Sequence, residues 1–189
     1  RIFMERTGAD YLAVAIGMAL THPDRVSRLV LIDSLPDHVR ERLVSPLMQR
    51  ALNTSVPAWL ARFGALFVGN RTMEAVLKEI IYDHTLVTPA VLDRSNRNRQ
   101  REDMITPLMS LRDSLPLWEQ HFAPRLKEIR HPTLILWGEQ DRLFPPQVGR
   151  DLQTTIPQAR LIMIPEAGHI PQWEQPQVVN RHITEFLQP

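Results

Sequence analysis

The sequence predicts an α/β protein built on a parallel sheet, and three apolar stretches carry this prediction. Residues 133–137 and 160–164 have the length and composition of buried strands. Residues 146–156 lie between them with the length and periodicity of a crossover helix, so the order strand, helix, strand gives a parallel βαβ unit. A third apolar stretch at 28–33 adds another buried strand earlier in the chain.

Composition places the chain among ordinary globular domains. Of its 189 residues 43% are hydrophobic and 23% are charged, the formal net charge is +1, and there is no cysteine. The lack of a basic block argues against a nucleic-acid partner, and the lack of cysteine excludes thiol chemistry, disulfides and Cys-ligated metals. The seven His are scattered without ligand spacing, so we expect no metal and no cofactor. No apolar run approaches the roughly 20 residues that span a bilayer and no signal peptide is visible, so we expect a cytoplasmic protein that binds no membrane.

The beginning of the chain predicts a strand, a helix and then the strand at 28–33. Residues 1–7 are half apolar and fit a short strand. Residues 9–21 are rich in helix formers and apolar nearly all round, which indicates a buried helix with Asp10 in its first turn. A His-Pro pair then ends this helix, because a residue before proline avoids the helical conformation.

Helical patterns dominate from residue 35 to residue 130, where no strand pattern is convincing. Thr72 is placed to cap one of these helices, in which Glu74 and Lys78 form an i,i+4 pair. Another carries a row of arginines that includes Arg94. The predicted helices are 39–52, 57–68, 72–82, 89–102 and 108–121, and a last amphipathic helix follows the βαβ unit at 176–187.

Two residues of catalytic type follow the strands of the βαβ unit. Asp141 comes shortly after the first strand and His169 after the second, 28 residues later. The carboxyl ends of parallel strands share one edge of the sheet, so these side chains can meet there. Each residue alone has a structural explanation, Asp141 as a turn residue and His169 as a hydrogen-bonded loop residue. Together they favour an acid that orients a histidine base, as in a nucleophile–His–acid triad.

These motifs carry a resemblance to a known family. Residues 137–142 and the pair Gly168 and His169 resemble the acid and base motifs of the α/β-hydrolase superfamily, and residues 23–33 resemble the strand that follows its nucleophile helix. The resemblance covers most of the chain. It implies a partial α/β-hydrolase fold, with a parallel sheet of about four strands and helices. The core would comprise residues 1–34 and 131–189, and residues 35–130 would form a helical cap.

The nucleophile of that family is not found in this sequence. The family places it in a Gly-x-Ser-x-Gly elbow before the helix that ends at Pro23. Counting back by the usual helix length puts that position on Ala9, and a slip of one residue puts it on Asp10, which would resemble the haloalkane dehalogenases. A third register gives Arg6. The first serine is Ser27, too late for any register, and we favour Asp10 as a helix-start residue rather than a nucleophile.

The resemblance is closest to hydrolases that split carbon–carbon bonds in ring-cleavage (meta-cleavage) products. It rests on residues 82–88 with the Arg-bearing helix after them, and on Trp173 shortly after His169. It implies a capped hydrolase that uses Asp141 and His169 on a small, partly apolar substrate, by carbon–carbon, ester or lactone hydrolysis. Trp173, Arg94 and Phe144 are placed at the substrate site. Arg94 has the alternative explanation of a solvated helix face, and Trp173 that of a core residue.

A second function stays open beside the hydrolase. The chain begins with Arg rather than Met and has no recognisable serine nucleophile, so we expect either a truncated or frame-shifted piece of a hydrolase or a degenerate homologue. In both cases it would be a catalytically inactive small-molecule binding module. A sheet that lacks neighbouring strands also exposes an edge, which predicts self-association.

Overall fold

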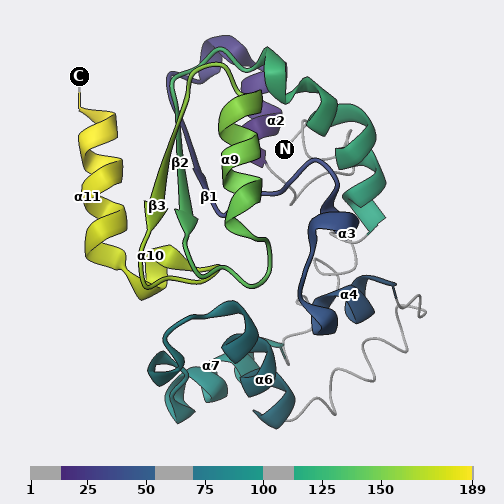
Figure 1. The fold of residues 1–189 in the computed structure, drawn as a ribbon, viewed down its shortest axis with the longest axis vertical. Coiled ribbons are helices and arrows are strands. Elements are labelled where there is room, and N and C mark those ends of the chain that lie inside the picture. Colours follow the sequence, from purple (N-terminus) through teal and green to yellow (C-terminus); the bar gives the residue numbers. More distant parts are fainter. Residues whose placement is uncertain (1–13, 54–69, 100–112, 189) are drawn as a thin grey trace.

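The structure, a computed structural model, describes residues 14–53, 70–99 and 113–188 (Figure 1). Within these residues three parallel strands form one sheet in the order β1-β2-β3: β1 is Leu29–Ile32, β2 is Thr133–Gly138 and β3 is Ala159–Ile164. Leu29 pairs with Thr133 in the first ladder, and Thr133 pairs with Ala159 in the second. The helix α9, Pro146–Thr155, connects β2 to β3, so the predicted βαβ unit is confirmed.

Helices cover both faces of the sheet (Figure 1). On one face α2, Val14–Thr21, and α9 enclose a core with side chains from β1 and β2. On the other face α11, Pro176–Leu187, packs Val179 and partly buried neighbours against the remaining strand side chains. All six residues of β2 are buried, because a central parallel strand has neighbours on both faces and both edges.

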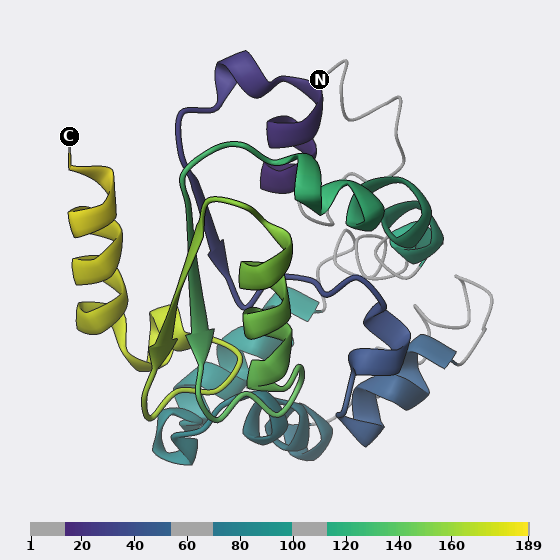
Figure 2. The ribbon, with the colours of Figure 1, turned by 45° about the horizontal axis from the view of Figure 1, so that its top comes forward.

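Most of the remaining helices of the described residues come between β1 and β2 in the sequence. In Figure 1 and Figure 2, α6 and α7 lie beyond the carboxyl ends of the strands, the edge to which loops from β2 and β3 also lead. Among the described residues no helix combines the length and apolar composition that crossing a membrane requires. The other helices are η1 Pro23–Arg25, α3 Val39–Arg42, α4 Pro46–Asn53, α6 Asn70–Ile80, η2 His84–Leu86, α7 Pro89–Arg99, the π-helical η3 Trp118–Phe122, η4 Ala123–Glu128 and α10 Pro171–Glu174.

The prediction of one helix at 39–52 is wrong, because Pro46 divides it. The α3 helix ends at Arg42, and Leu43 has the extended conformation φ −70°, ψ 115°. Proline disfavours the helical conformation in the residue before it but fits the first turn of a new helix. Ser45 then caps α4, since its hydroxyl accepts the Met48 N–H at 3.1 Å.

Two details of the next predicted helix have different outcomes. The placement of Thr72 as a cap is wrong, because α6 begins at Asn70 and Thr72 lies inside it. The pair of Glu74 and Lys78 is confirmed, with 2.5 Å between Lys78 Nζ and Glu74 Oε1. The strand at 1–7, the helix at 57–68 and the first part of the helix at 9–21 lie outside the described residues.

Candidate active site

Asp141 lies in the loop after β2 and is fixed there by backbone hydrogen bonds. Its side chain has no exposed surface. Its Oδ1 accepts the N–H of Leu143 at 2.7 Å and that of Phe144 at 3.1 Å, which forms a compact turn just before α9. The second carboxylate oxygen, Oδ2, is left for another donor.

That donor is His169, in the loop after β3. His169 Nδ1 and Asp141 Oδ2 are 2.9 Å apart, and the His169 side chain is 21% exposed. The hydrogen bond assigns the proton to Nδ1 and leaves the lone pair on Nε2. The ring of Phe144 meets the imidazole edge-on at 5.9 Å between centroids. The structure thus brings together the two side chains that the strand order predicted to meet.

The loops that carry these residues are joined to each other. Gln140 donates its backbone N–H to the Ala167 carbonyl at 2.9 Å, and its side-chain oxygen accepts the Ala167 N–H at 3.1 Å. Gly138, at the end of β2, packs so closely that a Cβ there would lie 2.0 Å from the Gly168 carbonyl oxygen. The acid loop and the base loop therefore hold one another in place.

A third titratable group at the same edge, Asp33, was not predicted. It follows β1 with a left-handed φ of 40°, is 7% exposed, and accepts the Gly138 N–H at 3.0 Å through Oδ1. Burial raises the pKa of Asp33 from its ordinary value of 3.8 to about 9, and the negative charge of Asp141 adds to the shift. The rule that identified Asp141, an acid directly after a buried strand, would also have found Asp33.

Asp33, Asp141 and His169 each have a polar atom within 4.8 Å of the others, a spacing that could hold a metal ion. However, Nδ1 of His169 is already at hydrogen-bond distance from Asp141, which is how an acid orients a base. While that hydrogen bond is kept, His169 Nδ1 is not available to a metal ion.

The base loop also contacts the helical segment between β1 and β2. Glu174, in α10, accepts the Gly168 N–H at 2.7 Å with one oxygen. Its other oxygen accepts the N–H groups of Tyr82 at 2.6 Å and Asp83 at 3.1 Å, just after α6. The His169 N–H donates to the Ile80 carbonyl at 2.7 Å. The end of α6 is therefore bound directly to the loop that carries the histidine.

The other predicted site residues are more dispersed. Phe144 lies against His169, as described above. Trp173 is half-buried in α10, where its backbone N–H donates to Ile170. Arg94 is exposed on α7. The candidate nucleophile positions Ala9 and Asp10 lie outside the described residues.

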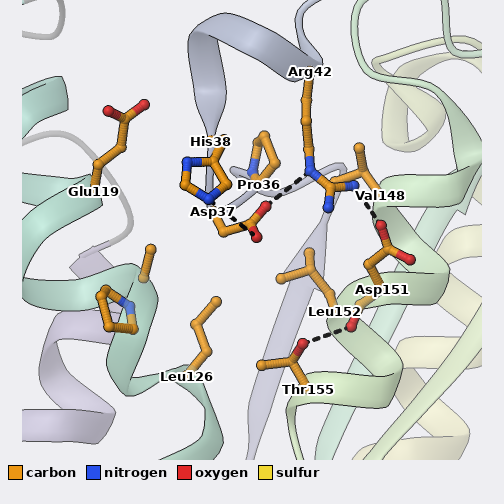
Figure 3. A pocket seen from close by; sticks show the side chains of 12 residues that line it. Pro36, Asp37, His38, Arg42, Glu119, Leu126, Val148, Asp151, Leu152 and Thr155 are labelled. Carbon is orange, nitrogen blue, oxygen red and sulfur yellow. Dashed lines mark hydrogen bonds and ion pairs between the residues drawn. The ribbon is translucent and has the colours of Figure 1, made fainter.

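A separate cavity of about 330 Å³ lies between α3, α9 and η4, and none of Asp33, Asp141 and His169 lines it. In Figure 3, Arg42 reaches between Asp37 and Asp151 and forms an ion pair with each, at 2.9 Å to Asp37. The pair with Asp151 ties α3 to α9, and the pair with Asp37 ties α3 to the segment just before it. The lining residues are Pro36, Asp37, His38, Arg42, Glu119, Ala123, Pro124, Leu126, Val148, Asp151, Leu152 and Thr155.

Two curated relatives are similar to most of this chain. The 2-hydroxy-6-oxo-6-phenylhexa-2,4-dienoate hydrolase of Burkholderia cepacia is 27% identical over 176 residues, which are 93% of this chain and 59% of the relative. The 2-hydroxy-6-oxononadienedioate/2-hydroxy-6-oxononatrienedioate hydrolase of Comamonas testosteroni has the same identity and coverage. The chain thus spans about six-tenths of the length of these relatives.

Solved structures and a family model agree on the fold. The meta-cleavage product hydrolase CumD from Pseudomonas fluorescens IP01 superposes with a TM-score of 0.66 at 23% identity, over 91% of this chain and 59% of CumD. The enol-lactonase from Burkholderia xenovorans LB400 superposes with a TM-score of 0.63 at 21% identity, over 95% of this chain and 62% of the lactonase. The family model described as "alpha/beta hydrolase fold" matches residues 13–176. Because this match covers most of the chain and the structure has the buried parallel strands of that fold, the chain belongs to the α/β-hydrolase family.

Proposed function

We propose that Asp141 and His169 are the acid and the general base of a hydrolase site. The observation that carries this proposal is the 2.9 Å contact between Asp141 Oδ2 and His169 Nδ1. Because two backbone N–H groups hold the other carboxylate oxygen, the acid cannot rotate away from the imidazole. The free Nε2 of a partly exposed imidazole can then take a proton from a nucleophile or from water.

The substrate we propose is small and partly apolar, and it is cleaved at a carbon–carbon, ester or lactone bond. The two relatives named above are hydrolases of a 2-hydroxy-6-oxo dienoate and of 2-hydroxy-6-oxo dienedioates and trienedioates, and one structural neighbour is an enol-lactonase. The buried Phe144 beside His169 supports a substrate with an apolar part. We further propose that residues 35–130 act as a cap, which is supported by the contact of the α6 end with the base loop.

The second candidate function is a binding module that has lost the chemistry. The observation in its favour is that alanine, not serine, occupies position 9, where we expect the nucleophile. The two functions differ in whether a hydroxyl at that position can use His169.

A gain-of-function experiment separates them. The parent chain is expected to show no His169-dependent hydrolysis of p-nitrophenyl acetate, whereas Ala9→Ser is expected to raise hydrolysis at least about tenfold, since a positioned general base contributes roughly 10²–10⁴ in rate. The gain should vanish in Ala9→Ser/His169→Ala and persist in Ala9→Ser/His121→Ala, a matched control because His121 is exposed in η3. Turnover of 2-hydroxy-6-oxo-6-phenylhexa-2,4-dienoate by the same variants then tests the carbon–carbon assignment.

Each other outcome has a definite meaning. If Asp10→Ser gains activity and Ala9→Ser does not, the register is shifted by one residue. If the parent chain already hydrolyses the ester through His169 and Asp10→Asn abolishes this, the carboxylate is the nucleophile. If no serine variant gains activity, the hydrolase proposal fails and the binding module stands.

A further inference from the structure

Asp33 is a buried carboxyl group that the proposed acid–base mechanism does not use. It lies directly after β1 at a φ of 40°, in the left-handed region that Asp enters more readily than most residues other than glycine. Its Oδ1 accepts the Gly138 N–H at 3.0 Å, but its Oδ2 is buried and has no hydrogen-bond partner among the described residues. A buried carboxyl oxygen without a hydrogen-bond partner calls for an explanation, and service to a neighbouring site is one.

The site it faces is the acid–base pair. Polar atoms of Asp33, Asp141 and His169 lie within 4.8 Å of one another. Among the described residues Asp141 has three donors, two backbone N–H groups and the imidazole, whereas Asp33 has one. Two carboxylates this close in a buried place cannot both be charged without a large free-energy cost, so the carboxyl with fewer donors is the one that keeps its proton.

The negative charges around Asp33 also favour its protonated form. In the described residues the titratable groups that face it are Asp141 from the loop after β2, His169 from the loop after β3 and Glu174 from α10. Burial raises the pKa of Asp33 most, to about 9, and the charges of Asp141 and Glu174 add to this, while the Gly138 N–H opposes it.

We propose that Asp33 is a positioning residue that serves His169 as a neutral carboxylic acid, holding Gly138 through Oδ1 and leaving Asp141 as the one negative charge in contact with the imidazole. This role rests on the proposed function of His169 as the base. If both carboxyl groups were ionised beside the ring, they would hold it as an imidazolium, which has no lone pair with which to accept a proton. The neutral acid therefore keeps His169 a base near neutral pH.

The alternative arrangement has the same total charge. The proton would move from Asp33 to the imidazole, giving an ionised Asp33 beside a His169 imidazolium. The two arrangements predict different effects of Asp33→Asn on His169: almost none if Asp33 is neutral, and a large one if Asp33 is ionised. Asn reproduces the shape of the neutral acid and its acceptor for the Gly138 N–H, but it has no proton to lose. An opposite charge within about 4–6 Å shifts a pKa by roughly 1–3 units, which is readily measured.

The experiment is an NMR titration of the His169 ring and the Gly138 amide in the whole chain, with His169→Gln to assign the ring signals. In the parent protein both signals should show a step near pH 9 as Asp33 ionises. In Asp33→Asn that step should disappear, while the His169 ring signals should otherwise titrate as they do in the parent protein. Asp141→Asn is the positive control, because loss of the charge in contact with the ring should change the titration of the His169 signals.

Two results would overturn the proposal. One is a change in the titration of the His169 signals in Asp33→Asn as large as the change in Asp141→Asn, because Asp33 would then carry the charge. The other is the lack of any alkaline step in the parent protein. A purely structural role is tested by Asp33→Ala, which should free the Gly138 amide, whereas Asp33→Asn should keep it protected. The titration requires no turnover, so it remains readable if the hydrolysis experiment fails.

Discussion

Two buried carboxyl groups lie side by side at the carboxyl ends of β1 and β2, but the chain surrounds them differently. The turn after β2 aims two N–H groups at Asp141, whereas Asp33 receives only the N–H of Gly138 among the described residues. This difference follows from local backbone geometry that residue types alone do not specify. Sequence reasoning therefore identified Asp141 and His169, whose strand positions are readable, and missed the group that completes their surroundings.

At the residue scale, Asp33 should make stability fall as pH rises. The pKa of Asp33 is about 9 in the folded protein and 3.8 in an ordinary environment, so between these values folding takes up a proton. Stability from this group is thus greatest below about pH 4 and decreases up to about pH 9. Asp33→Asn removes this dependence of stability on pH. The unfolding free energy of the variant minus that of the parent should therefore increase by up to ~1.4 kcal/mol per pH unit.

Urea unfolding of both proteins at about pH 5, 7 and 8.5 measures this difference. Asp93→Asn, at an exposed position on α7, is the matched control and should follow the parent. A difference between Asp33→Asn and the parent that stays constant over this range would show that Asp33 is already ionised at pH 5.

At the element scale, the sequence predicted the elements that are marked by an unbroken apolar pattern, and it failed where a single residue ends an element. The βαβ unit was predictable because fully buried parallel strands are unbroken apolar runs. The helix at 39–52 was not, since its apolar periodicity continues through Pro46 although the backbone cannot. The contact of α6 with the base loop was invisible in the sequence, because it uses backbone N–H groups that every residue has.

Glu174 should hold the end of α6 and the base loop together as one unit. Its two oxygens accept N–H groups from Tyr82, Asp83 and Gly168, segments that are far apart in the sequence. Glu174→Gln replaces one acceptor oxygen by an NH₂ group that cannot accept. Since a hydrogen bond to a charged group contributes roughly 1.5–3 kcal/mol, the local opening free energy should fall by about that amount.

Amide hydrogen exchange measures this effect, with faster exchange expected at Tyr82, Asp83 and Gly168 together. Glu139→Gln, at an exposed position in the acid loop, is the control. Unchanged exchange at Tyr82 and Asp83 in Glu174→Gln would show that α6 is held by other contacts.

At the scale of the whole molecule, helices cover both faces of the sheet, while the outer edges of β1 and β3 are both unpaired in the described residues. Within them β1 pairs only with β2. The N–H groups of Leu29 and Asp33 both point to the β2 side, so by strand alternation those of Val30 and Ile32 point to the outer edge of β1. The predicted strand at 1–7 lies outside the described residues, and the chain spans 59% of its relatives.

The outer edge of β1 predicts self-association through strand pairing. Light scattering after gel filtration should show a mass that rises with protein concentration. Val30→Pro should shift the protein towards the monomer, since it removes an outward N–H while an edge strand tolerates proline. Leu31→Pro, whose N–H faces β2, should instead unfold the sheet. A parent protein that stays monomeric at high concentration would contradict the prediction.

The close approach of Gly138 to Gly168 limits how this site could be varied. A Cβ on Gly138 would lie 2.0 Å from the Gly168 carbonyl oxygen, and one on Gly168 would lie 2.5 Å from the Ile80 carbonyl oxygen. Backbone thus meets backbone at two successive junctions, where no side chain can shift to relieve a clash. A library that randomises a single loop, or a chimaera that exchanges one, would break the fit between these segments. A functional chimaera should therefore take the end of β2, the loop with Gly168 and the end of α6 from the same parent protein.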